Sequence, residues 1–491
     1  MARPSSLLTD SHASHCNPLV GGVNGADWIQ SADSMTTNQR QSLLSNPGVR
    51  TFLIIWLGQF VSRVGTAMTR FALLIWAYEQ TGAVTTVALL GFFGFLPYVL
   101  LSPVAGVWVD RLDRRKVMLL SDLGSGIVTA ALIVLFFTGD LAIWHLYVVE
   151  ALTAALDAFQ VPAYSAASTV LLPKELYGRA GGLRSMADDG ARILAPFLGG
   201  VVIAAVGIGA VLIVDVVTFL AAVLTLIVIR VPDVRGQQDE APHFWREMRF
   251  GFDYIRRRPG LLGLTLHFTV VNFFAALTYF GVLPAMVLAR TGGDEVALGL
   301  VQGALGAAGL VGGLLMATWG GPRRKIHGVL IATALSFLLG DFLFAVGRGV
   351  VVWMIAAVAA AVFIPILLGS RSAIWQAKVA PAVQGRVFAT DGMLRLALFP
   401  FGYLLAGIIA DGWLEPAMAA GGTLAPVFGP LVGVGPGAGM ALMFVGTATM
   451  GSLMSVLAYL FPGVRNVESD LPDFDAEEKK PQITPITPIS E

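Results

Sequence analysis

Two pairs of charged residues interrupt two long apolar stretches of this 491-residue chain. Arg63 and Arg70 lie in the first apolar stretch, and Glu150 and Asp157 lie in the fourth. Seven residues separate the members of each pair, which is nearly two turns of an α-helix, so each pair shares one helix face. If the two helices cross a membrane antiparallel to each other, Arg63 faces Asp157 and Arg70 faces Glu150.

Charges paired in this way offer a chemistry that an isolated charge does not. A charge in the core of a bilayer costs several kcal/mol unless it is paired or hydrated. When an arginine moves away from its carboxylate, the acid is therefore stabilised by binding a proton. We expect the four residues Arg63, Arg70, Glu150 and Asp157 to be candidates for proton coupling. A double salt bridge with a purely structural role explains the same pattern equally well.

Further charged residues lie near the ends of apolar runs. Asp188 and Arg192, and likewise Asp391 and Arg395, are four residues apart, as in ion pairs on one helix face. We expect both pairs near the cytoplasmic ends of their helices, where they would serve gating. Asp215 lies about six residues from the expected outer end of the sixth run, where water could reach it. A coupling role for Asp215 is a secondary hypothesis.

The composition indicates the kind of element that positions these groups. Hydrophobic residues make up 56% of the chain and charged residues 13%, with a mean hydropathy of +0.74. Soluble domains carry about 25% charged residues, so we expect a membrane protein. The formal net charge is +0, which gives no reason to expect a nucleic-acid partner.

The sequence lacks the motifs of common cofactor-dependent enzymes. The single cysteine, Cys16, excludes a disulfide framework and a cysteine-rich metal site. The chain has no GxxxxGK[ST] phosphate loop and no HExxH metalloprotease motif, and its six histidines are scattered. We therefore expect no metal, no cofactor and no ATP hydrolysis, and we disfavour a membrane-embedded enzyme.

Twelve apolar runs are long enough to cross about 30 Å of hydrocarbon as helices. They cover roughly residues 52 to 78, 84 to 108, 117 to 138, 142 to 164, 181 to 205, 209 to 230, 261 to 289, 296 to 319, 326 to 347, 350 to 370, 387 to 411 and 437 to 461. The sequence therefore predicts an all-α membrane protein with twelve transmembrane helices. Residues 1–48, which show no signal-peptide pattern, and residues 463–491 are expected to be disordered tails.

The positions of lysine and arginine predict the orientation of the bundle, because cytoplasmic loops retain these residues. Basic clusters such as Arg323, Arg324 and Lys325 follow the even-numbered runs, whereas the odd-numbered runs are followed only by Arg290 and Arg348. We expect both termini and the central loop in the cytoplasm and the protein in the cell membrane.

An internal repeat divides the chain into two parallel six-helix halves, residues 49–230 and 261–462. An offset of 209 positions places Arg114 on Arg323, and an offset of 207 places Arg179 on Arg386. Such a duplication is common in secondary transporters.

The segment between the halves, residues 231–260, has the pattern of an amphipathic helix. Its apolar residues Phe244, Met248, Phe252 and Ile255 are spaced by four, four and three positions. We expect this helix to lie on the inner leaflet. A lipid-specific or regulatory site is the alternative interpretation of its basic residues.

The stretch GVWVDRLDRRKVMLLSD, residues 106–122, gathers charges between two apolar runs. With twelve runs in two halves, it resembles the major facilitator superfamily, whose loop after the second helix has the form GxxxDRxGRRxx. The matching residues are Gly106, Asp110, Arg111, Arg114 and Arg115. Asp113 replaces the second glycine of the motif. The resemblance implies that Asp110 latches the cytoplasmic gate by meeting the N-terminus of the eleventh helix, expected near Arg386.

The stretch ARILAPFLGG, residues 191–200, is similar to the antiporter motif GxxxGPxxGG of exporters in this superfamily. Pro196, Gly199 and Gly200 match it, and Ala191 and Ala195 stand where it has glycine. These small residues predict close packing on the eighth helix, which carries Gly299, Gly303, Gly306 and Gly313. Packing alone and a role in gating explain the motif about equally well. Stretches such as WLGQF and DVVTF look like the branch that contains macrolide-efflux proteins and the enterobactin exporter.

Together these features predict a secondary active transporter that works by alternating access. The resemblance implies proton-coupled efflux of an amphipathic small molecule, such as a drug, macrolide, siderophore or peptide natural product. Aromatic residues could contact such a substrate, including Phe92, Phe93, Phe273, Phe274, Tyr279 and Phe280. We expect a monomer whose partners are the substrate and the lipid bilayer. An importer of the same fold is the nearest alternative, and a channel is disfavoured because paired core charges form no ring of like charge.

Overall fold

The computed structural model describes residues 47–109, 112–172, 176–228 and 244–473. The chain divides into two units, Met1–Thr51 and Phe52–Glu491, and the account below concerns the second unit. Every regular element among the described residues is helical. The all-α prediction is therefore confirmed.

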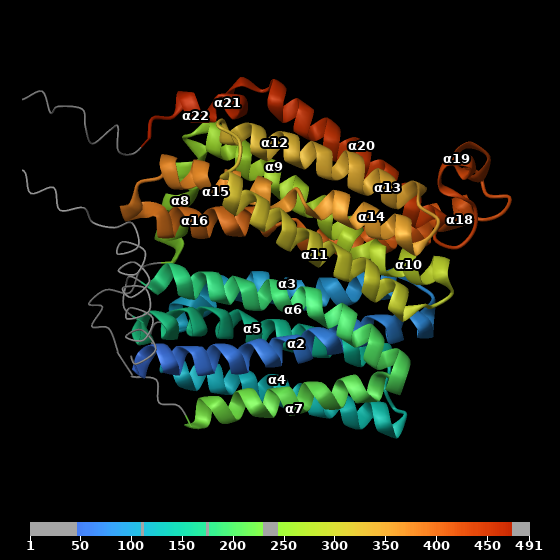
Figure 1. Ribbon diagram of the computed structural model, residues 1–491, viewed down its shortest axis with the longest axis horizontal. Coiled ribbons are helices and arrows are strands. Elements are labelled where there is room, and N and C mark those ends of the chain that lie inside the picture. The colour runs from blue at the N-terminus through green and yellow to red at the C-terminus, as the bar shows by residue number, and fades with distance from the viewer. Residues whose placement is uncertain (1–46, 110–111, 173–175, 229–243, 474–491) are drawn as a thin grey trace, which may run out of the picture. The chain divides into compact units, whose positions relative to one another are not determined.

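Six long helices follow one another in the first half of the chain (Figure 1). They are α2 (Pro47–Thr81), α3 (Val84–Val109), α4 (Arg114–Thr138), α5 (Ile143–Leu171), α6 (Tyr177–Val206) and α7 (Ile208–Val228). Helix α5 packs against both α3 and α4, and α7 packs against α4 and α6. One face of α4 exposes Leu120, Ile127 and Val134, which are seven residues apart. An apolar stripe of this kind on the outside of a bundle is suited to contact lipid.

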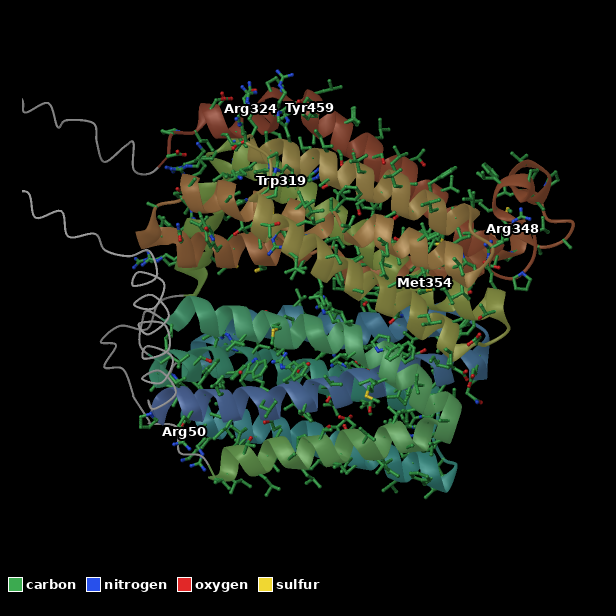
Figure 2. All side chains as sticks on the ribbon, viewed as in Figure 1. Arg50, Trp319, Arg324, Arg348, Met354 and Tyr459 are labelled. Atoms are coloured by element: carbon green, nitrogen blue, oxygen red, sulfur yellow. The ribbon has the colours of Figure 1, made fainter. Side chains whose placement is uncertain are left out.

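The second half is built from shorter segments joined into long helices. These are α9 (Pro259–Ala275), η2 (Ala276–Val282), α10 (Leu283–Thr291), α11 (Glu295–Trp319), α12 (Lys325–Leu335), η3 (Ser336–Asp341), α13 (Phe342–Val346), α14 (Val350–Ala361), α15 (Ile364–Lys378), α16 (Pro381–Leu396), α17 (Phe399–Ile409), η4 (Ala410–Leu414), α18 (Glu415–Met418), α19 (Ala425–Val432), α20 (Ala438–Leu460), α21 (Pro462–Arg465) and α22 (Val467–Asp470). The three segments named η are π-helical turns inside longer helices. Figure 2 shows Arg324 and Arg348 at opposite ends of this half, one before α12 and the other after α13.

Eleven described helices are long and apolar enough to cross a membrane. The remaining predicted span corresponds to α6, whose apolar part covers Gly190–Val206. The tenth span, predicted for residues 350 to 370, runs over Val350–Lys378 and so includes Arg371 and Lys378. The prediction ends the span before these two charged residues.

The N-terminus of α4 explains why an aspartate replaces glycine in the motif loop. Asp113 is the N-cap of α4, and its carboxylate accepts hydrogen bonds from the backbone amides of Arg115 at 3.0 Å and Lys116 at 3.3 Å. Such a cap satisfies amides that the first helical turn leaves unpaired. The departure from the motif therefore gives the third helix a defined start.

Helix α8 (Phe244–Arg256) forms in the predicted linker and packs against α16. Its buried side includes Gly251 and Ile255, and a Cβ built on Gly251 would lie 2.9 Å from the carbonyl oxygen of Arg386. Phe252, expected on the apolar stripe, is 43% exposed, whereas Ile255 is buried. The small residue Gly251 allows α8 to approach α16 closely. The expected position of this helix on the inner leaflet stays a prediction.

Residues 463–473, expected to begin a disordered tail, are ordered and helical in part. Val464 and Val467 are buried in an apolar cluster with α9. The carboxylate of Glu468 accepts hydrogen bonds from the amides of Lys325 at 3.0 Å and Ile326 at 2.9 Å, which caps α12. The segment is held because it supplies apolar side chains and a helix cap that the second half lacks otherwise.

The two halves share one apolar core and meet through close helix contacts. The largest buried cluster contains Phe71 and Ile75 of α2 together with Met286, Leu298 and Phe444 of the second half. Helix α6 packs against α11, and α3 packs against α17. Both contacts join a helix of the first half to a helix of the second half.

Candidate functional site

Arg70 of α2 binds two carboxylates of α5 that share a helix face. Its Nε lies 3.4 Å from Oε2 of Glu150, and its Nη2 lies 3.3 Å from Oδ2 of Asp157. The predicted pairing of Arg70 with Glu150 is confirmed. Arg70 also reaches Asp157, for which the helix register predicts Arg63 as the partner, because a guanidinium carries N–H donors along two edges and contacts two acids at once.

The Arg70 cluster, defined as Arg70, Glu150 and Asp157, is only partly shielded from solvent. The side chains of Arg70 and Asp157 are 40% and 39% exposed, whereas that of Glu150 is 12% exposed. The guanidinium of Arg70 thus faces two carboxylates of one helix at once.

Close backbone approach positions Glu150. A Cβ built on Gly94 of α3 would lie 2.7 Å from Oε2 of Glu150. The absence of a side chain at Gly94 therefore leaves the room in which the carboxylate meets Arg70. Gly94 was not predicted as a site residue, because the sequence analysis relied on charged side chains and glycine has none.

Asp215 of α7 lies beside the Arg70 cluster rather than near water at a helix end. Its residue is 1% exposed, and its Oδ1 accepts a hydrogen bond from the hydroxyl of Thr66 at 3.1 Å. A cavity of about 30 Å³ separates it from Arg70 and Glu150. The hydroxyl groups of Thr66, Thr69, Ser125, Thr129 and Thr153 line this cavity together with the apolar side chains of Leu73, Leu132, Val149 and Phe219. Asp215 is therefore enclosed by protein, contrary to the expectation that bulk water reaches it at a helix end.

One buried carboxylate of the first half, Asp122, was not predicted as a site residue. Asp122 of α4 accepts a hydrogen bond from Nε2 of Gln59 at 2.8 Å and another from Nε2 of Gln160, which also donates to Oε1 of Gln59 at 3.1 Å. All three residues are buried. The acid was missed because its partners are uncharged amides, which carry no pairing signal in the sequence.

The second half also contains a buried carboxylate, Asp341, that the sequence analysis did not single out. Asp341, at the end of η3, is 0% exposed. It accepts hydrogen bonds from the hydroxyl of Tyr279, in η2, and from the hydroxyl of Thr447, in α20, the latter at 2.5 Å. The available signal was one acid inside the otherwise uncharged part of the ninth apolar run.

The motif loop can be examined only in part, since Asp110 and Arg111 lie outside the described residues. Gly106 ends no helix and lies within α3. Arg114 donates to the carbonyl oxygen of Ala166 at 3.3 Å. Arg115 donates to the carbonyl oxygens of Leu226 at 2.9 Å and Ile227 at 2.7 Å. Arg115 thus satisfies carbonyls in the last turn of α7 (Ile208–Val228), where positive charge is favoured, whereas Ala166 lies more than one turn before the end of α5.

The expected receiving end of the latch lies elsewhere than predicted. Helix α16 begins at Pro381, so Arg386 lies beyond the first turn rather than at its start. The guanidinium of Arg386 lies 5.7 Å from the ring centre of Phe250 on α8. The proline sets the start of this helix, because its fixed backbone angle and missing N–H suit the first helical position.

Of the two predicted helix-end pairs, the one on α16 is confirmed. Nε of Arg395 lies 3.1 Å from Oδ2 of Asp391. Asp391 also pairs with Arg371 of α15 and accepts a hydrogen bond from the hydroxyl of Thr265 at 2.8 Å. This acid therefore ties three helices together inside the second half. The pair on α6 cannot be compared, because the side chain of Asp188 lies outside the described residues, while Arg192 is exposed.

The residues of the antiporter-like motif form the contact between α6 and α11. A Cβ built on Gly299 would lie 2.7 Å from the carbonyl oxygen of Pro196, and one built on Gly200 would lie 3.0 Å from that of Glu295. Gly199 faces the ring of Phe71, 3.0 Å away by the same measure. The predicted packing of this helix on the eighth span is confirmed. A gating role requires that this contact change during transport.

No group of three or more histidine, cysteine, aspartate or glutamate residues within the described ranges is arranged to hold a metal ion. The carboxylates of the Arg70 cluster are engaged by a guanidinium.

Comparison with known proteins finds a matching family model and several relatives. The family model of the Major Facilitator Superfamily matches residues 55–402. Macrolide efflux protein A of Streptococcus pyogenes is 27% identical over 365 residues, which cover 73% of this chain and 89% of that protein. Multidrug efflux pump Tap of Mycolicibacterium fortuitum is 26% identical over 378 residues, with the same two coverages.

Solved structures share the fold at low sequence identity. The crystal structure of a bacterial homologue of the human lysosomal transporter Spinster superposes with a TM-score of 0.64. The match is 18% identical and covers 87% of this chain and 99% of that one.

Proposed function

Because the chain belongs to the Major Facilitator Superfamily, we propose that it is a secondary active exporter that moves an amphipathic small molecule outward in exchange for protons. Relatives named for macrolide efflux and multidrug efflux support the direction and the substrate class. The substrate class comprises drugs, macrolides, siderophores and peptide natural products. Both termini face the cytoplasm in this proposal, in line with the distribution of basic residues.

The observation that carries proton coupling is the guanidinium of Arg70, which two carboxylates share. With Arg70 between Glu150 and Asp157, at most one negative charge is uncompensated. Displacement of Arg70 by a conformational change or a cationic substrate leaves the acids unpaired, and the cost of an unpaired charge then favours proton uptake. Proton binding and arginine binding thus compete for the same oxygens, which links protonation to the conformational state.

An aromatic cluster that joins the halves supports an amphipathic substrate. The ring centres of Phe95 in α3 and Phe399 in α17 are 4.5 Å apart. Phe280 and Tyr403 add rings 5.5 Å from Phe399. Flat apolar rings beside a partly exposed charge cluster suit a molecule with one apolar face and one polar face. Of the aromatic residues that the sequence suggested, Phe280 belongs to this cluster.

Transport into inverted vesicles or proteoliposomes under an imposed pH gradient tests the proposal, with a radiolabelled macrolide as the probe. Glu150→Gln and Asp157→Asn should abolish accumulation driven by the gradient. Asp253→Asn is the matched control, since this acid lies on α8 and pairs loosely with the exposed Arg249 at 3.9 Å. Gradient-driven accumulation at the wild-type level in both cluster variants would overturn proton coupling through this site.

The direction of transport is tested by the same preparation. An exporter accumulates the probe in inside-out vesicles and depletes it from intact cells, whereas an importer does the reverse. Accumulation in intact cells that depends on this protein would support the importer and contradict the proposed direction.

A further inference from the structure

Asp341 is an acid in the apolar core of the second half, held by neutral partners. The residue is 0% exposed. The hydroxyl of Tyr279 donates to its Oδ1, and the hydroxyl of Thr447 lies 2.5 Å from its Oδ2. Both partners are hydroxyl groups, so neither supplies a positive charge.

The elements packed against Asp341 supply no cation near it. Helices α14 and α20 and segment α13 contain no charged or histidine residue. On α12 the titratable residues are Lys325 and His327, which precede Asp341 by about 24 and 21 Å of helix at 1.5 Å per residue. Arg290 of α10, a helix that also packs against α20, donates to the carbonyl oxygens of Gly347 at 2.9 Å and Val432 at 2.6 Å.

A carboxylate in this setting is costly unless it carries a proton. Burial of an unpaired charge in an apolar medium costs several kcal/mol or more. The rings of Phe344 and Phe444 stand edge-on to Tyr279, with centres 5.8 Å away, and close the site on its apolar side. Two hydroxyl donors do not replace the hydration that an ionised carboxylate loses.

The hydrogen-bond pattern accommodates a proton on Oδ2 of Asp341. The hydroxyl of Thr447 lies 3.3 Å from the carbonyl oxygens of both Met443 and Phe444, so it can donate to its own helix. Its oxygen is then free to accept the proton of Asp341, while Tyr279 donates to the other carboxyl oxygen. Every polar hydrogen of the three side chains then has an acceptor.

Two π-helical turns bring these residues together. Tyr279 lies in η2 and Asp341 lies in η3, so both residues lie where their helices depart from regular α geometry. Such turns occur preferentially at functional sites, because they re-aim a side chain at a cost in regular hydrogen bonding. A structural role alone would be served by a regular helix and an apolar residue.

We propose that Asp341, Tyr279 and Thr447 form a proton-binding site of the second half, separate from the Arg70 cluster of the first half. Asp341 holds its proton at neutral pH in the conformation described. Its release in another conformation contributes to the proton movement that drives transport, and this second statement rests on the proposed function. A carrier with one site in each half would couple protons to the relative motion of the halves.

Infrared spectroscopy tests the protonation state without any substrate. The purified protein at neutral pH should show the carbonyl band of a buried carboxylic acid, shifted by carbon-13 labelling of aspartate. Asp341→Asn should remove this band, and Glu150→Gln should retain it. Tyr279→Phe should move it to higher frequency, because one hydrogen bond to the carbonyl is lost. A wild-type spectrum without a band that depends on Asp341 would overturn the proposal.

Transport measurements test the coupling role. Asp341→Asn fixes the site in a neutral form, so gradient-driven accumulation should be lost while exchange of labelled for unlabelled substrate is retained. Tyr279→Phe keeps the acid and alters the same site, so it distinguishes loss of the titratable group from misfolding. This variant should retain accumulation and show a changed pH profile. Gradient-driven accumulation by Asp341→Asn equal to the wild type would overturn the coupling role. If the wild type carries no substrate, the proposed function fails while the infrared result still decides the site.

Discussion

The carboxylate of Asp411 in η4 caps the helix that contains Thr85, which belongs to the other half of the chain. Oδ2 of Asp411 accepts a hydrogen bond from the amide of Thr85 at 2.6 Å, and Oδ1 accepts one from the amide of Val84 at 3.1 Å. These are the first amides of α3, where negative charge is favoured. The motif loop predicts a latch between Asp110 and the eleventh span at the cytoplasmic end. In that latch an acid of the first half meets a helix start of the second half. In the cap by Asp411 an acid of the second half meets a helix start of the first half, at the end expected to face outside.

Loss of this cap should favour opening of the end at which α3 begins. Asp411→Ala removes an N-cap contribution of about 0.5 to 2 kcal/mol, which is roughly a two- to thirtyfold change in a conformational equilibrium. Spin labels at Ala83 and Gly412 should report a larger population of long distances. Asp294→Ala is the matched control, because Asp294 caps α11 within one half through the amide of Ala297 at 2.9 Å. Equal distance distributions in the two variants would contradict a latch role for Asp411.

The contact between α6 and α11 should tolerate no side chain at Gly299. Gly299→Ala places a Cβ against the backbone carbonyl of Pro196, which cannot rotate away. Overpacking of this kind typically costs about 1 to 3 kcal/mol, so the melting temperature in detergent and the transport rate should both fall. Gly313→Ala on the same helix is the control, since nothing lies within 4 Å of the added Cβ. If the two variants melt and transport alike, close packing at Gly299 is not required.

The room left by Gly94 should decide whether Glu150 reaches Arg70. Gly94→Ala places a Cβ 2.7 Å from Oε2 of Glu150, so the carboxylate must move and gradient-driven transport should fall. The double variant Gly94→Ala with Glu150→Asp carries a shorter acid and should regain part of the transport rate. The measurement is the initial rate of probe uptake under a fixed pH gradient. Failure of the shorter acid to rescue would assign the defect to helix packing rather than to the carboxylate.

The sequence located the Arg70 cluster because charge inside an apolar run is rare and the spacing of seven places two charges on one face. It did not locate Asp122 or Asp341, since amide and hydroxyl partners carry no charge and lie in distant parts of the chain. It did not predict that Arg70 reaches Asp157 as well as Glu150, because helix register gives the level of a residue in the membrane but not the reach of its side chain. Contacts made by neutral groups therefore require the three-dimensional structure.

Helix ends were predicted less well than the positions of the apolar runs, for a related reason. The sequence predicts a tenth span over about residues 350 to 370, because Arg371 and Lys378 are charged, although both residues are buried in α15. Arg371 remains in the helix because Asp391 neutralises it, and Lys378 because the carbonyl oxygens of Glu468 at 2.6 Å and Leu471 at 2.5 Å accept its protons. The π-helical turns were not predicted, because no residue pattern distinguishes them from regular helix.

The ion pair of Arg371 with Asp391 should matter more for stability than the pair of Arg395 with the same acid. The side chain of Arg371 is 11% exposed and that of Asp391 is 4% exposed, whereas that of Arg395 is 25% exposed. Arg371→Ala leaves a buried carboxylate without its best-shielded cation, which typically costs about 3 to 5 kcal/mol. The melting temperature in detergent should fall further for this variant than for Arg395→Ala. The double variant Arg371→Ala with Asp391→Asn removes the stranded charge as well, so it should melt above Arg371→Ala alone. Equal melting of Arg371→Ala and Arg395→Ala would show that neither arginine is the main counter-ion of Asp391.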